Sequence, residues 1–329
     1  MESALRIEDV TKRFGDFTAV DGLTLNVPPG TIYGILGPNG AGKSTTLRMV
    51  MNIIGRDSGT IEVLGMDPVD DRRILRRVGY LPEERGLYKK MRVLDVIVFF
   101  AELKGVERKE AARRAGEWLE RMDLGERATS RVETLSKGMQ QKVQFIATVL
   151  HGPDILILDE PTSGLDPVNQ EVLSETIVGA KREGRTVLLS THNMLQAQTM
   201  CDSVCIIAQG RKVLDGNVQD LRRAHRGHRF YVEFDRVTPA IERFMTDAAL
   251  VPAGRARGNG HFAAVQQAGR GWEVELQEGV ATPALVAELN ELDAPLCRFE
   301  HLEPSLHEIF VAHVGAARAA RRTGKSDRA

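Results

Sequence analysis

Cysteine is scarce in this sequence: among 329 residues only Cys201, Cys205 and Cys297 occur. An odd, sparse set of cysteines does not build a disulfide framework, and it suits a reducing compartment. Cys201 and Cys205 could share a helix face, but no histidine or second cysteine pair accompanies them at zinc spacing. The sequence therefore argues against a disulfide scaffold, and we interpret the cysteines as ordinary thiols.

Long apolar runs and an excess of charge of one sign are absent as well. No stretch reaches the ~18 apolar residues that a membrane helix needs, and the most apolar segment, Val93–Ala101, contains Asp95. Lys and Arg number 44 and Asp and Glu 45, so no global positive field attracts nucleic acid. Residues 1–10 lack the pattern of a signal peptide. A role at a membrane would require another chain to span it.

The length predicts two domains, because 329 residues are about twice the usual size of one. Up to about residue 224, short apolar runs such as Thr31–Leu36 and Ile155–Leu158 alternate with amphipathic helical patterns, which favours a mainly parallel α/β sheet. The first thirty residues instead suggest antiparallel strands, Leu5–Val10 and Leu23–Val27. We expect domain 1–224 to end where a basic stretch, residues 222–229, shifts the composition.

Residues 225–313 predict a second, smaller domain of the α+β class. Six segments read in the order β-α-β-β-α-β: 229–234, 239–245, 262–267, 272–276, 283–292 and 296–300. A Gly/Arg-rich turn is expected at 254–260. The basic tail 314–329 has almost no large apolar side chain, so we expect it to be disordered, the alternative being a contact with acidic lipids.

A phosphate-binding loop is the most specific signal in the chain. Residues 37–44 fit the motif G-x-x-x-x-G-K-[ST]. They follow an apolar strand and open a helix, as that motif requires. Glycines let the backbone N–H groups wrap a polyphosphate, and the helix presents its positive end to the anion. We expect Lys43 to bridge the β- and γ-phosphates and the Ser44 hydroxyl to bind Mg²⁺. The predicted nucleotide-binding residues are Gly37, Pro38, Asn39, Gly40, Ala41, Gly42, Lys43, Ser44 and Thr45.

A strand that ends in two acidic residues narrows the class of P-loop enzyme to which the chain can belong. Residues 155–158 are apolar and are followed by Asp159 and Glu160. Asp159 can reach the Mg²⁺ ion, as in other P-loop enzymes. Glu160 is placed to polarise a water for in-line attack on the γ-phosphate.

Three further segments carry a resemblance to the ATPases of ABC transporters. Leu135-Ser136-Lys137-Gly138-Met139-Gln140 resembles their signature motif, Ser163-Gly164-Leu165-Asp166 their D-loop, and His192 their switch histidine. The resemblance covers about residues 4–220. It implies a P-loop ATPase fold with a mixed sheet core, an antiparallel β subdomain and a helical subdomain.

The resemblance also implies a mechanism in which two ATPase protomers meet head to tail, as a homodimer or with a paired ATPase subunit. Each ATP lies between the P-loop of one protomer and the signature residues Ser136, Lys137, Gly138, Met139 and Gln140 of the other. His192 contacts the γ-phosphate, and Asp166 acts across the interface. Phe14 resembles the aromatic residue that stacks on adenine, although it could be a plain core residue.

This chain departs from the family pattern at three positions. Lys137 stands where the signature usually has glycine, and Met139 where it has glutamine. In Gly79-Tyr80-Leu81-Pro82-Glu83, Glu83 occupies the position of a glutamine that lies near Mg²⁺. A carboxylate can also bind Mg²⁺, so we include Glu83 with Ser44 and Asp159 among the expected metal ligands.

Segments 81–88, 135–141 and 302–310 are similar to ATPase subunits of type-2 exporters, in which an accessory C-terminal domain follows the ATPase. This similarity implies ATP-driven export through a separate polytopic permease, with the chain cytoplasmic and peripheral on the inner face of the membrane. Residues 93–100 would then border the groove for the permease, or else form ordinary core.

The alternative is a soluble ABC ATPase that acts on ribosomes or DNA. Only 93 residues separate Lys43 from Ser136, without sustained heptads, and the chain has one P-loop and one signature. Near-neutral charge also disfavours nucleic acid as a partner. A P-loop kinase would leave residues 136–138 and His192 unexplained.

Overall fold

The computed structural model describes residues 3–84, 86–249 and 261–313 of the chain. They form two compact units, of which one extends to Gln219 and includes Phe310–His313, while the other comprises Asp220–Ile309. The expected boundary after residue 224 remains a proposal. The predicted turn at 254–260 and the basic tail at 314–329 lie outside the described residues. No helix in the described ranges is long and apolar enough to cross a membrane.

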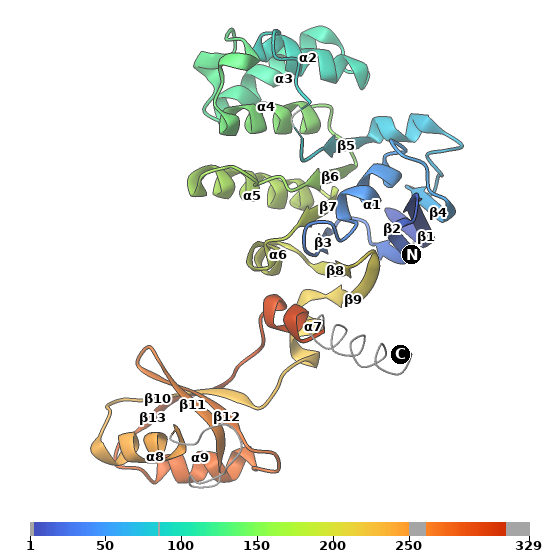
Figure 1. Cartoon of the computed structure of the whole chain (residues 1–329). Coiled ribbons are helices and arrows are strands. Elements are labelled where there is room, and N and C mark those ends of the chain that lie inside the picture. Colours follow the sequence, from blue (N-terminus) through green and yellow to red (C-terminus); the bar gives the residue numbers. More distant parts are fainter. Residues whose placement is uncertain (1–2, 85, 250–260, 314–329) are drawn as a thin grey trace. The chain divides into compact units, whose positions relative to one another are not determined.

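A six-stranded sheet forms the centre of the first unit, with strand order β5-β6-β7-β3-β8-β9 (Figure 1). All neighbours pair in parallel except β8 and β9. Every residue of β3, β6 and β7 is buried, which explains why the first two read as continuous apolar runs up to Leu36 and Leu158. The strands are β3 Ile32–Leu36, β5 Val78–Leu81, β6 Ile155–Asp159, β7 Thr186–Thr191, β8 Ser203–Ala208 and β9 Arg211–Asn217.

A separate three-stranded antiparallel sheet, of order β2-β1-β4, confirms the antiparallel N-terminal region. Its strands are β1 Leu5–Phe14, β2 Phe17–Val27 and β4 Ser58–Val63. The first two strands are longer than the alternation of apolar residues suggested. They continue until Phe14 pairs with Phe17, so the turn lies at Gly15 and Asp16.

Helices α1, α5 and α6 accompany the central sheet, whereas α2, α3 and α4 pack on one another as a helical part. Val93, Val96 and Ile97 of α2 are buried, so this half of the apolar segment is core. Phe99 and Phe100 are only half-buried. The helices are α1 Lys43–Val50, α2 Val93–Leu103, α3 Arg108–Arg121, α4 Lys137–Val149, α5 Pro167–Arg182, α6 Met194–Met200 and α7 Val218–Ala224, with 3₁₀ helices at Arg72–Arg77, Gly125–Arg127 and Val132–Thr134.

The second unit confirms the predicted order β-α-β-β-α-β. Its four strands form an antiparallel sheet of order β11-β12-β10-β13, and both helices lie on one face of it (Figure 1). Phe230, Val232 and Phe234 alternate toward the buried core with Trp272 and Val274. The elements are β10 Arg229–Phe234, α8 Pro239–Ala249, β11 Phe262–Ala268, β12 Gly271–Leu276, α9 Thr282–Asn290 and β13 Leu296–His301.

Candidate active site

The loop between β3 and α1 wraps closely against its neighbours. Gly37 has a φ of +152°, and a Cβ atom there would lie 2.2 Å from the carbonyl oxygen of Ile207. Gly42 begins α1 with a φ of +106°, and a Cβ there would lie 2.5 Å from the Ala19 oxygen. Only glycine fits these positions, which leaves the backbone free to face a cavity. That cavity has a volume of about 380 Å³ and is lined by Phe17, Ala19, Asn39, Gly40, Ala41, Gly42, Lys43, Ser44, Thr45, Glu83 and Glu160.

Lys43 lies in this cavity with only 6% of its surface exposed. Its Nζ donates hydrogen bonds to the carbonyl oxygens of Gly37 at 2.8 Å and Pro38 at 3.3 Å. The carboxylate of Glu160 lies 3.7 Å from the same atom. A buried ammonium held mainly by neutral carbonyls is a strong site for a polyanion, because a phosphate oxygen offers it a full charge partner.

Asp159 ends β6 directly beneath the loop. Its Oδ1 accepts hydrogen bonds from the Ser44 hydroxyl at 3.2 Å and from the Ser190 hydroxyl. Its Oδ2 is buried and has no hydrogen-bond partner within the described part of the chain. An unpartnered carboxylate oxygen beside a serine hydroxyl is a set of hard oxygen donors that suits Mg²⁺. The residues present therefore fit the metal that the sequence implied.

Glu160 follows in a backbone conformation that non-glycine residues rarely adopt, with a φ of +48°. Its N–H donates to the Ser190 carbonyl oxygen at 3.1 Å, and its Oε2 accepts a long hydrogen bond from the Thr191 hydroxyl. Its Oε1 lies 2.9 Å from Nδ1 of His192. Left-handed backbone of this kind costs about 1–3 kcal/mol and concentrates at functional sites. Here it turns a buried carboxylate into the cavity.

Glu83 reaches the same cavity from the segment after β5 and is exposed to solvent. The structure thus brings together the P-loop, Glu83 and Glu160, with Asp159 beneath the Ser44 hydroxyl. These residues come from three separate segments of the chain. Their convergence follows from the parallel sheet, in which the carboxyl ends of β3, β5, β6 and β7 share one edge.

The signature residues and Asp166 are not among the residues that line this cavity. The hydroxyl of Ser136 caps α4 by accepting a hydrogen bond from the Met139 N–H at 3.2 Å, and Lys137 beside it is exposed. Asp166 caps α5 in the same way, and hydrogen bonds from the backbone and side chain of Asn169 hold its pKa below the usual range. Both helix ends are therefore formed within one chain, away from the chain's own phosphate loop.

Phe14 is 51% exposed and lies near Lys12, and it is not among the residues lining the cavity. Phe17, its partner across the turn, is a lining residue that the sequence analysis did not identify. The signal in the sequence that could have identified Phe17 is its spacing from Phe14 across the turn residues Gly15 and Asp16. The stacking role of Phe14 stays a prediction.

The sequence analysis also did not identify Ser190 and Thr191 as residues that hold the acidic side chains of the site in place. Ser190 bonds to both Asp159 and Glu160, and Thr191 bonds to Glu160. Both precede His192 at the end of a fully buried strand. Buried hydroxyls at that position could have been recognised as groups that need partners.

Comparison with known proteins adds to this geometry. The family model for "ABC transporter" matches residues 20–163, and the model for "ATP-binding protein DrrA1-3-like, C-terminal domain" matches residues 216–314. A Bacillus subtilis (strain 168) protein, "Uncharacterized ABC transporter ATP-binding protein YhaQ", is 40% identical and is matched over 95% of this chain and 99% of its own length.

Two further matches each cover about two thirds of this chain. "Nod factor export ATP-binding protein I" of Paraburkholderia xenovorans (strain LB400) is 38% identical over 65% of this chain and 71% of its own length. A solved structure titled "Structure of ATP binding subunit of ABC transporter" is 31% identical, has a TM-score of 0.64 and covers 68% of this chain and 93% of its own.

Replacing Lys43 tests the assignment of the phosphate loop. Lys43→Ala removes the buried cation, and a charge-assisted hydrogen bond contributes about 1.5–3 kcal/mol, so ATP should bind about 10- to 100-fold more weakly. Calorimetric titration with ATP measures the affinity, and thermal unfolding verifies that the variant is folded. Undiminished affinity in a folded variant would contradict the assignment.

Replacing Glu83 tests whether a carboxylate is essential at that position. Glu83→Gln removes one charge but keeps an oxygen toward the cavity, so ATP turnover should remain within about tenfold of the original chain. Phosphate release by the purified variant measures this. Complete loss of turnover would show that the charge itself is required.

Proposed function

Since the chain belongs to the family of ABC transporter ATP-binding proteins, we propose that it powers export through a separate membrane-spanning permease. The chain is an ABC-type ATPase subunit, and its relatives include a Nod factor export protein. The observation that carries the catalytic part is that Lys43 and Glu160 line one cavity while Asp159 accepts a hydrogen bond from the lining residue Ser44. The export part rests on those relatives and on the accessory domain matched at residues 216–314.

Hydrolysis follows from the positions of these side chains. Backbone N–H groups of the loop and Lys43 hold the β- and γ-phosphates of ATP, and Ser44 and Asp159, with Glu83 nearby, would hold Mg²⁺. Bound Mg²⁺ neutralises charge on the phosphate oxygens. Glu160 orients a water and takes its proton as the water attacks in line. His192, 2.9 Å from the Glu160 carboxylate, fixes that carboxylate and contacts the γ-phosphate.

A second ATPase protomer completes the site in this proposal. Ser136 and Asp166 lie at exposed helix ends outside the chain's own cavity, so each can serve the nucleotide of a partner. The N-terminus of α4 carries a partial positive charge that favours a phosphate. ATP then joins two chains, and hydrolysis separates them.

The permease would dock on an apolar surface of the helical part. Through this contact the chain would lie on the cytoplasmic face of the membrane. Tyr88, Phe99 and Phe100 form one aromatic cluster with ring centroids 5.5–6.0 Å apart. Tyr88 is 53% exposed and Leu103, one turn further along α2, is 61% exposed. Clustered exposed apolar side chains of this kind favour a protein partner.

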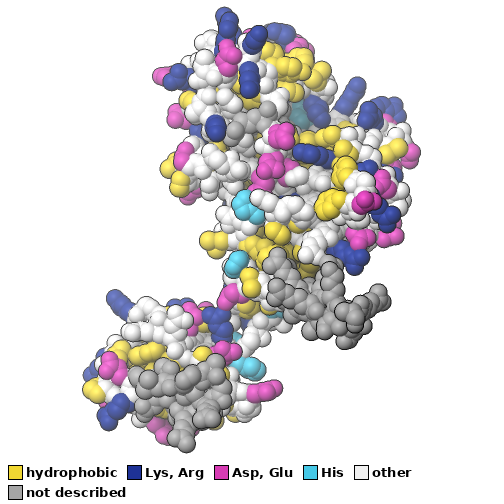
Figure 2. Space-filling model, viewed as in Figure 1, with side chains coloured by type: hydrophobic (Ala, Val, Ile, Leu, Met, Phe, Trp, Pro, Cys, Tyr) yellow, Lys and Arg dark blue, Asp and Glu magenta, His cyan; other side chains and the backbone are white. Residues whose placement is uncertain are grey.

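Action on ribosomes or DNA lacks comparable support. Figure 2 shows basic and acidic side chains interspersed over the visible face, without the continuous basic track that nucleic-acid binding uses. We therefore retain the transport function alone.

Glu160→Gln tests the catalytic role and the partnership together. The amide cannot take the proton from water, so turnover should fall by about a hundredfold or more, while ATP binding persists and the dimer stays closed. Phosphate release and gel filtration with ATP and Mg²⁺ measure these effects. Turnover equal to that of the original chain would refute the role of Glu160.

The same variant identifies the partner. Tagged Glu160→Gln is expressed in its native host, membranes are solubilised with ATP and Mg²⁺, and co-purifying proteins are identified. A polytopic membrane protein should be captured, and Lys43→Ala in the same background is the control that should lose it. Ribosomal or DNA-bound partners without any membrane protein would overturn the transport function.

A further inference from the structure

Glu83 reaches the cavity at the phosphate loop from a segment that has already left the sheet. Strand β5 ends at Leu81, and Glu83 is exposed although it lines the same cavity as Lys43 and Glu160. Its carboxylate has no hydrogen bond or ion pair with another described residue. The direction of this side chain therefore depends on what fixes the backbone that carries it.

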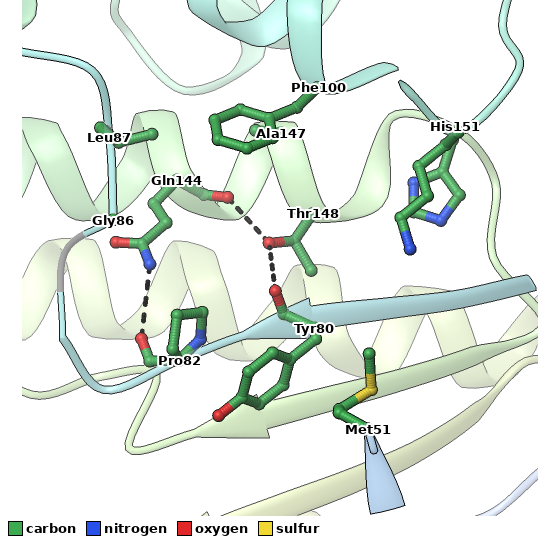
Figure 3. A pocket seen from close by; sticks show the side chains of 11 residues that line it. Met51, Tyr80, Pro82, Gly86, Leu87, Phe100, Gln144, Ala147, Thr148 and His151 are labelled. Carbon is green, nitrogen blue, oxygen red and sulfur yellow. Dashed lines mark hydrogen bonds between the residues drawn. The ribbon is translucent and has the colours of Figure 1, made fainter. Parts of the chain in front are cut away.

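Gln144, a buried residue of α4, holds that backbone. Its side chain is 5% exposed, and its Nε2 donates hydrogen bonds to the carbonyl oxygens of Pro82 at 3.4 Å and Glu84 at 3.2 Å. Figure 3 shows the amide reaching from the helix to Pro82. These oxygens belong to the peptide groups before Glu83 and after Glu84. Because a peptide group is planar, a hydrogen bond to its oxygen restricts the orientation of the whole group.

Helix α4 lies close against the end of β5 at the same place. A Cβ atom on Gly79 would lie 2.5 Å from the Thr148 carbonyl oxygen, and the Thr148 hydroxyl lies 3.4 Å from the Tyr80 oxygen. Gln144 precedes Thr148 by one helical turn, so both face the same side. Together they line a second cavity, of about 310 Å³ (Figure 3). Thr148 thus contacts the strand, and Gln144 contacts the segment that follows it.

Stability alone does not explain an amide at position 144. Gln144 Oε1 is buried and has no hydrogen-bond partner in the described part of the chain. The cost of one unpaired buried oxygen is of the same order as the gain from two neutral hydrogen bonds, and both bonds of Nε2 are long. An apolar side chain of similar volume would fill the space without that cost. The backbone that the amide holds is the better explanation.

We propose that Gln144 is a positioning residue for the metal site. By holding the backbone on both sides of Glu83, it directs the Glu83 carboxylate toward the Mg²⁺ that Asp159 would bind. This role rests on the proposed function, in which Glu83 lies near that metal. Gln144 itself does not line the cavity at the phosphate loop, so it acts through Glu83 alone.

The metal affinity gives this role a measurable size. A carboxylate whose backbone is already fixed loses less conformational freedom when it binds a cation. Residues that orient a metal ligand typically change metal affinity by about 10–100-fold. Since Gln144 orients only one of the expected ligands, and does so through the backbone, Gln144→Met should weaken metal binding by about tenfold.

The test measures the affinity of the full chain for Mn²⁺, a paramagnetic substitute for Mg²⁺, by electron paramagnetic resonance with the β,γ-imido analogue of ATP. Glu83→Ala and Gln144→Met should each weaken Mn²⁺ binding. The double variant should bind Mn²⁺ no more weakly than Glu83→Ala alone, because Gln144 then has no carboxylate to direct. Thr148→Val is the matched control: it removes a polar group from the same helix and cavity without freeing the peptide groups around Glu83, and should leave the affinity unchanged.

The outcomes separate this role from the proposed function. If Mn²⁺ does not bind with the nucleotide, the proposed ATPase site fails, and if Glu83→Ala leaves the affinity unchanged, the metal role of Glu83 fails; either result also refutes the role of Gln144. If Glu83→Ala weakens binding but Gln144→Met does not, only the role of Gln144 is refuted. The same holds if the two effects multiply in the double variant, or if Thr148→Val loses as much affinity as Gln144→Met.

Thermal unfolding verifies that each variant is folded. The midpoint for Gln144→Met should stay within about 4 °C of that of the original chain, since the lost hydrogen bonds and the removed unpaired oxygen offset each other. Gln144→Leu takes its place in the same measurements if Gln144→Met does not fold.

Discussion

Lys43 carries a positive charge into a site where little of its surface meets water. Two carbonyl oxygens of its own loop and a glutamate at 3.7 Å hold it there. Such an arrangement requires a loop whose oxygens turn inward around the lysine, which only glycines at Gly37 and Gly42 permit. It also requires a flanking sheet that delivers acidic groups to the same edge. The pairing of β6 with β7 places Ser190 beside these acids, and its hydroxyl bonds to both Asp159 and Glu160.

The sequence predicted the parts of this site that depend on local chemistry. The phosphate loop is contiguous, and Asp159 and Glu160 end an apolar run, so residue order alone places them. The family resemblance placed Glu83 near the metal, and Glu83 lines the cavity, but two other side chains from separate segments were missed. Both side chains reach the site through strand pairing. Phe17 pairs with Phe14 across the turn between β1 and β2. Ser190 lies on β7, which pairs in parallel with β6. Nothing in their immediate neighbours in the sequence specifies those contacts.

In the second unit, too, local sequence predicted some features and long-range pairing determined others. Alternation of apolar residues predicted its six elements in the right order, because each strand buries one face and the helices cover that face. The pairing of β10 with both β12 and β13 is a long-range property that alternation does not encode. The extra length of β1 and β2 has a similar origin, since polar residues continue a strand once a partner strand supplies hydrogen bonds.

Helix α4 begins at the signature segment and ends beside the cavity that Gln144, Thr148 and His151 line. Ser136 caps its first turn, and His151 follows its last residue by two positions. Thirteen residues at 1.5 Å each make a rod of about 20 Å, and its middle is buried along Val143, Phe145 and Ile146. Buried residues continue from Gln141 to Val149, whereas Ser136 and Lys137 at the first turn are exposed. The buried half of the helix therefore fixes the position and direction of the exposed N-terminal end.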